Sequence, residues 1–143
     1  MKTQLFTLAA MLLLTVACSK KEEATHADAN EWPQLDSFHM IMAEAFHPFK
    51  DSANLQPAKA LAAEMATEAE TWAAAELPEK VNTEHVKGLL AQLKSDTRNF
   101  ADKIAAGAAD EEISSDLTAL HDSFHSIMEA WHKGPSGGHQ HQH

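Results

Sequence analysis

Residues 110–133 read DEEISSDLTALHDSFHSIMEAWHK, and within them large apolar side chains recur every three or four positions. These side chains are Ile113, Leu117, Leu120, Phe124, Ile127 and Trp131. The spacing puts them on one face of an α-helix, and an isolated amphipathic helix is marginal in water, so this face must pack against other helices. Asp110 is the expected N-cap, and Gly134-Pro135 is the expected stop.

Three segments upstream repeat this spacing. Their apolar stripes are Leu35, Phe38, Met42, Ala45 and Phe49; Ala58, Leu61, Met65, Ala69 and Trp72; and Val86, Leu90, Leu93, Phe100 and Ile104. Each connection between the segments is short enough to make neighbouring helices antiparallel. The sequence therefore predicts an all-α fold, an up-down-up-down antiparallel four-helix bundle over residues 32–133.

The composition disfavours several classes of protein. The chain has 143 residues, with 11 Lys and Arg against 21 Asp and Glu, a formal net charge of −10 with His neutral. Such a balance disfavours nucleic-acid binding, which needs clustered cations to neutralise phosphates. No nucleophile motif, Gly-rich phosphate loop or catalytic carboxylate pair is recognisable, so we do not expect an enzyme. The 10 histidines are the outstanding feature of the composition.

The N-terminal end differs from the bundle in composition. Residues 1–17 combine Lys2 with an apolar run too short to span a bilayer, which is typical of a secretion signal peptide. Residues 14–18, LTVAC, resemble a bacterial lipoprotein signal. The resemblance implies that Cys18 is lipidated and anchors the protein to a membrane. We therefore expect a periplasmic or surface-facing protein of the bacterial cell envelope, with residues 18–31 as a flexible tether.

The C-terminal end is rich in histidine. Residues 134–143 read GPSGGHQHQH, a composition that predicts disorder. Several neutral imidazoles on one such segment can bind Zn²⁺, Cu²⁺ or Ni²⁺, so His139, His141 and His143 are candidate metal ligands. The predicted organisation is a signal peptide at 1–17, a tether at 18–31, a bundle at 32–133 and a tail at 134–143.

A short motif occurs in both the first and the last expected helix. Asp-Ser-Phe-His stands at residues 36–39 and again at residues 122–125, and both copies continue to Glu-x-x-His. In two antiparallel helices, the numbers of residues at the same height along the bundle add up to one constant value. By this rule His39 is expected to lie at the height of His125 and to face it. His121 lies one turn from His125 on the same face. The predicted metal site consists of His39, His121, His125 and Met42.

The neighbouring residues allow more than one interpretation. Asp36 and Asp122 each precede a candidate ligand by three residues, and we expect them to orient its ring N–H; solvated surface charge is the alternative. Met42 is either a ligand or core filler. The Glu-x-x-His segments at 44–47 and 129–132 lie roughly ten residues out of level, so they do not share a di-iron site.

Residues 32–133 resemble the small four-helix bundles of the periplasmic b-type cytochrome and cytochrome c-prime superfamily. The resemblance rests on helix order, on the long second connection at 76–83, and on the closing pattern of Leu117, Asp122, Phe124 and His125. It implies that His125 and His39 are the two axial ligands of a b-type haem. Covalent attachment is excluded because the chain has no Cys-x-x-Cys-His motif.

Three functions therefore remain open. The first is an envelope lipoprotein that binds Cu, Zn or Ni for metal handling or sequestration, which the histidine-rich tail favours. The second is a non-covalent bis-histidine haem protein that carries electrons or binds haem. The third is a structural lipoprotein that binds another envelope protein and needs no cofactor, with its histidines as surface features.

Overall fold

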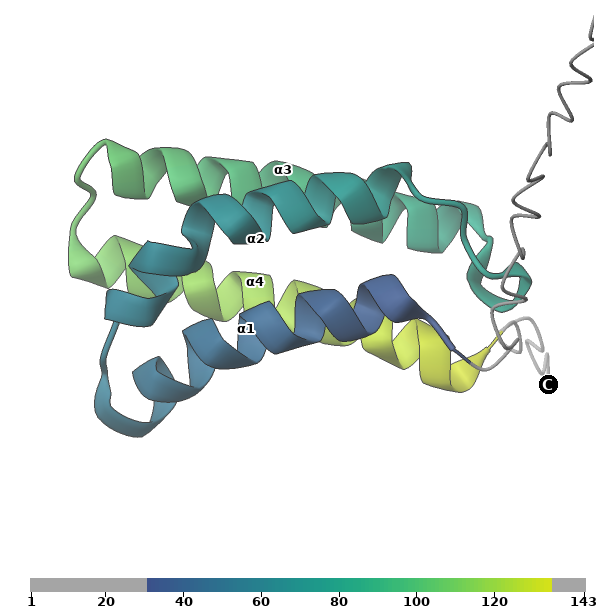
Figure 1. Cartoon of the computed structure of the whole chain (residues 1–143), viewed down its shortest axis with the longest axis horizontal. Coiled ribbons are helices and arrows are strands. Elements are labelled where there is room, and N and C mark those ends of the chain that lie inside the picture. Colours follow the sequence, from purple (N-terminus) through teal and green to yellow (C-terminus); the bar gives the residue numbers. More distant parts are fainter. Residues whose placement is uncertain (1–30, 135–143) are drawn as a thin grey trace, which may run out of the picture.

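The computed structural model describes residues 31–134, which form helices and their connections. The helices are α1 (Pro33–Ser52), α2 (Gln56–Ala74), α3 (Glu84–Ala105) and α4 (Asp110–Lys133), with a 3₁₀ turn, η1 (Glu79–Val81), between α2 and α3. Each α-helix packs against the next, and α1 also packs against α4 (Figure 1). The predicted all-α four-helix bundle is confirmed.

Local chemistry explains where the helices begin and end. The Thr83 hydroxyl caps α3 by accepting a hydrogen bond from the backbone N–H three residues on, at 3.2 Å. After α3 the chain turns at Gly107, whose φ of 79° suits glycine. The prediction that Asp110 caps α4 is wrong, because Ala109 occupies the cap position. Asp110 is the first helical residue, and its Oδ1 lies 2.6 Å from Nζ of Lys59, which ties α4 to α2.

The predicted apolar stripes form the core. All their members are buried except Phe49, Leu61 and Ile104, which are partly buried and pack against the rest. The stripes did not include Trp32, which lies just before α1 and is 1% exposed, or Phe46 in the last half of α1. Both lie near the ends of α1, where the helical spacing alone does not show which ring turns inward.

A cluster of aromatic rings joins α1, α2 and α4. Phe38 contacts Trp72 with ring centroids 5.6 Å apart and Phe124 with centroids 5.5 Å apart. Trp32 contacts Trp72 at 5.1 Å and Trp131 at 5.5 Å. Because each ring removes a large apolar area from water, this cluster contributes strongly to holding α1 against α4.

The fold does not test the predictions for the two ends of the chain. The signal peptide at 1–17, Cys18, the tether up to residue 30 and the tail at 135–143 lie outside the described residues. Within residues 31–134, no helix is long and apolar enough to cross a membrane.

Replacing Trp72 with Ala should lower the free energy of unfolding by about 3–5 kcal/mol, because a large buried ring is lost and the cavity cannot fully collapse. Met40→Ala is the matched control, since Met40 is 73% exposed and its loss should cost less than about 0.5 kcal/mol. Chemical denaturation followed by far-ultraviolet circular dichroism measures both. Equal effects of the two substitutions would contradict the position of the core.

Candidate functional site

The two Asp-Ser-Phe-His copies meet because their phenylalanines share the core. Phe38 of α1 and Phe124 of α4 are both buried and in contact. Successive side chains on a helix point about 100° apart. The residues that follow the two phenylalanines, His39 and His125, therefore reach the surface, and both are exposed. The ring of His39 stacks on Phe124 with centroids 5.4 Å apart and planes at 25°.

The structure brings two of the predicted ligands, His121 and His125, into direct contact on α4. Their Nε2 atoms lie 3.1 Å apart, and their ring centroids lie 4.4 Å apart with the planes at 61°. The four-residue spacing places both rings over the same turn of the helix. In the neutral pair one Nε2 carries the proton and donates to the other, whose lone pair is free to accept.

The ring of His121 is held in place by α1. It stacks on Phe46 with centroids 3.8 Å apart and planes at 10°. Phe46 is itself buried and contacts Phe49 edge-on at 5.9 Å. On the far edge of the imidazole from Nε2, Nδ1 lies 3.7 Å from Oδ1 of Asp122. Phe46 and Asp122 thus orient Nε2 of His121 toward His125.

Burial lowers the pKa of the His121 imidazole below its ordinary value of 6.5, and the nearby charge of His125 lowers it further. A hydrogen bond and the charge of Asp122 oppose this shift, while His47 on α1 adds to it. A transition metal binds the neutral imidazole. His121 is therefore kept in its metal-binding form at neutral pH.

The remaining predicted site residues lie apart from this pair. Met42 is 1% exposed and belongs to the core, and Asp36 is exposed on α1. Asp122, expected to orient His125, lies against His121. Within residues 31–134, no three His, Cys, Asp or Glu side chains lie close enough together to hold one metal ion. His39 does not complete a three-histidine group with His121 and His125.

Two residues that contribute to the site were not identified from the sequence. Phe46 supports the ring of His121, and His47 is an exposed side chain within electrostatic range of it. The sequence does contain a signal for His47. Its number and that of His121 add up to four more than those of His39 and His125, so the two lie within about one helical turn of the same level.

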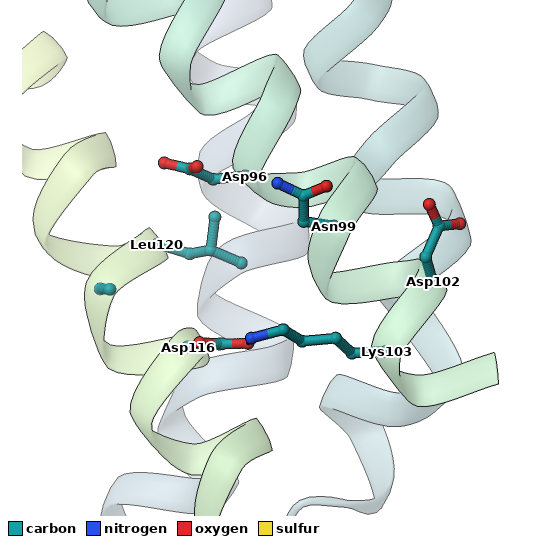
Figure 2. A pocket seen from close by; sticks show the side chains of 7 residues that line it. Asp96, Asn99, Asp102, Lys103, Asp116 and Leu120 are labelled. Carbon is teal, nitrogen blue, oxygen red and sulfur yellow. The ribbon is translucent and has the colours of Figure 1, made fainter. Parts of the chain in front are cut away.

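A depression between α3 and α4 is a second location with polar side chains (Figure 2). It has a volume of about 400 Å³ and is lined by Asp96, Asn99, Asp102, Lys103, Asp116, Ala119 and Leu120. Nζ of Lys103 lies 2.7 Å from Oδ2 of Asp116 and 2.9 Å from Oε1 of Glu112, both on α4. The hydrogen bonds that Lys103 donates to Asp116 and then to Glu112 raise its pKa above the ordinary 10.5. The depression is thus the ion-paired joint between α3 and α4.

No protein family model, curated protein or solved structure matches this chain. The chain is a small all-helical four-helix protein, and its site is inferred from the geometry of its own residues. Among the described residues, His121 combines direct contact with a second histidine, partial burial and a lowered pKa.

Two substitutions should move the pKa of His121 in opposite directions. His125→Gln removes a positive neighbour and should raise it, whereas Asp122→Asn removes a favourable carboxylate and should lower it further. Nuclear magnetic resonance titration of the ring C–H signals measures both shifts. A change of the same sign in the two variants would contradict the arrangement described here.

The same shift should make the stability of the fold depend on pH. A histidine whose pKa falls on folding contributes stability that is fully present above its unfolded pKa of about 6.5 and is lost as pH falls through that value toward the folded pKa. Between about pH 7.5 and about pH 5.5, the wild type should therefore lose more free energy of unfolding than His121→Gln. His85→Gln, which removes an exposed histidine on α3, should keep the wild-type slope. Equal slopes for all three proteins would refute the prediction.

Proposed function

We propose that this protein is an envelope lipoprotein that binds a transition-metal ion, Cu, Zn or Ni, through histidines on α1 and α4, for metal handling or sequestration. The observation that carries the proposal is the contact between Nε2 of His121 and Nε2 of His125 at 3.1 Å. The lipoprotein part rests on the resemblance of residues 14–18 to a lipidation signal at Cys18.

The separation of the two nitrogens suits one metal ion. With bonds of about 2.0–2.1 Å, two imidazole nitrogens on one ion stand about 2.9 Å apart at a right angle and about 3.3 Å apart at the tetrahedral angle. The distance of 3.1 Å between His121 and His125 falls between these values. An ion bound by both nitrogens would lie off the line that joins them, so each ring would turn to aim its Nε2 lone pair at the ion.

The surroundings of the pair support binding of a cation. His39 and His47 are exposed on the neighbouring helix α1, and His47 is near enough to affect the pKa of His121. The chain carries a formal net charge of −10, which raises the local concentration of cations. Two protein ligands leave coordination positions open to water, so the bound ion exchanges readily, as metal transfer requires.

A b-type haem between His39 and His125 is the alternative that the cytochrome resemblance implies. Haem needs an apolar slot between its axial ligands. Phe38 and Phe124, which directly precede the two histidines, contact each other in the core with ring centroids 5.5 Å apart, and both histidines are exposed. A bare ion on the surface of α4 fits these residues better than a haem within the bundle does.

Metal titration of a chain ending at Gly134, purified from the envelope of a bacterial host, tests the proposal without the tail. We expect uptake of about one equivalent of Cu²⁺ or Zn²⁺, measured by calorimetry and elemental analysis. The double variant His121→Ala with His125→Ala should bind at least about tenfold more weakly, a loss of about 1.4 kcal/mol. His85→Ala is the control and should bind like the parent protein.

Uptake that survives the double substitution would overturn the proposal, and so would the absence of uptake by the parent protein. A Soret band that is lost in both His39→Ala and His125→Ala would establish the haem alternative instead. Neither metal nor haem would leave a structural lipoprotein that binds another envelope protein.

A further inference from the structure

The histidine pair on α4 has no third ligand of the kinds that hold Zn²⁺. Protein sites that retain a transition metal use three or four N, O or S ligands. Among residues 31–134, no third His, Cys, Asp or Glu side chain joins His121 and His125 in one group. Methionine is a further side chain that binds transition metals, through its thioether sulfur. A third ligand from this part of the chain is therefore to be sought among the methionines.

The carboxylates beside the pair have other contacts. Oδ1 of Asp122 lies 3.7 Å from Nδ1 of His121, on the opposite edge of that ring from Nε2. Glu129 follows His125 by one turn of α4, and its Oε2 lies 2.9 Å from Nζ of Lys133. Both carboxylates thus point to partners other than the two Nε2 atoms.

Four methionines lie in the described part of the chain, and their surroundings differ. Met42 and Met65 belong to the core and are 1% and 0% exposed, whereas Met40 on α1 is 73% exposed. Met128 on α4 is partly buried, since it packs against the core and keeps part of its surface in solvent. Its place at the rim of the core gives its flexible thioether access to an ion on the surface of α4.

Helix geometry puts Met128 beside the pair. At about 100° and about 1.5 Å per residue, Met128 lies about 60° around α4 from His125 and about 4.5 Å further along the axis. Around the axis it lies within about 20° of His121. Residues three apart on a helix are neighbours, and a long side chain leans back over the turn that precedes it, so Met128 extends toward His125. The three side chains therefore lie along one edge of α4.

We propose that Met128 is the third ligand of this site and that the ion the site selects is Cu(I). This inference rests on the proposed function, which supplies the two imidazoles. Thioether sulfur is a soft ligand that selects Cu(I), whereas Zn²⁺ binds thiolate, imidazole and carboxylate. Among the ions Cu, Zn and Ni, reduced copper is the one that a set of two histidines and one methionine fits.

The charge of the site favours a monovalent ion in the same way. Two neutral imidazoles and a thioether carry no negative charge, so nothing among the ligands offsets the second charge of a divalent ion. Aromatic rings adjoin the pair, with Phe46 stacked on His121 at 3.8 Å and Phe124 edge-on to His125 at 6.1 Å. Desolvation beside apolar rings costs less for a single charge than for a double one.

Anaerobic titration of Cu(I) against a chromophoric Cu(I) chelator tests the inference. The background protein is the full chain with Cys18→Ser and with His139, His141 and His143 each replaced by Gln, so that a thiol and the tail imidazoles do not compete. We expect this background to bind about one equivalent of Cu(I).

Met128→Leu is the test variant, because Leu keeps an apolar side chain of similar size and removes the sulfur. It should weaken Cu(I) binding at least about tenfold and change the affinity for Zn²⁺ by less than about twofold. Met40→Leu is the matched control, which removes an exposed sulfur of α1 and should leave both affinities unchanged. X-ray absorption at the copper edge gives a second readout, since the sulfur neighbour of Cu(I) should be absent from Met128→Leu.

The outcomes separate this inference from the proposed function. Unchanged Cu(I) affinity in Met128→Leu would overturn the inference alone, and so would a background protein that binds Zn²⁺ or Cu²⁺ but no Cu(I). Equal weakening of Cu(I) and Zn²⁺ binding would assign Met128 to packing instead of ligation and would overturn it too. If His121→Ala with His125→Ala bound these ions as tightly as the background, the inference and the proposed function would both be overturned.

Discussion

The contact between Phe38 and Phe124 is the constraint on which the rest of this structure depends. It joins the first helix to the last, and through Trp72 it extends to the second. Because each phenylalanine immediately precedes a histidine, burying the two rings obliges His39 and His125 to emerge at the surface on neighbouring helices. The two copies of the motif thus have the same arrangement, in which a buried phenylalanine fixes the following histidine at the surface of the bundle. Loss of the aromatic layer would therefore separate α1 from α4 and disperse the histidines.

The helices and the core could be predicted from the sequence because both follow from periodicity. A spacing of three and four fixes which face of a helix is apolar, and nearly every residue of the four predicted stripes is buried. The site was harder to predict, because the axial level of two residues does not determine where their rings turn. His39 and His125 were expected to face each other across α1 and α4. Instead His39 stacks on Phe124, while His125 contacts His121 on its own helix. Similarly, Asp110 has the chemistry of a cap, but it is the first residue of the helix and forms an ion pair with Lys59.

The role of Phe46 shows why the missing information lies in tertiary contact. Nothing in its spacing distinguishes it from Phe49, and only packing between α1 and α4 places it flat against the imidazole of His121. That contact helps to orient the ring and covers one of its faces, while Asp122, His125 and His47 also act on its pKa. Burial and the charge of His125 both disfavour the protonated form of His121, and neither disfavours the neutral form in the same way. The orientation of the His121 ring and its lowered pKa thus both depend on packing at the α1–α4 interface.

An even number of antiparallel helices adds a further constraint on where a bound ion would be held. α1 begins and α4 ends at the same end of the bundle (Figure 1). A lipid on Cys18, as proposed, would therefore tie that end toward the membrane, with at most about 14 residues of chain in between. His125 lies about two turns of α4 from Lys133, near the same end. The proposed ligands would consequently lie toward the lipid-attached end of the bundle, within the reach of this tether from the membrane.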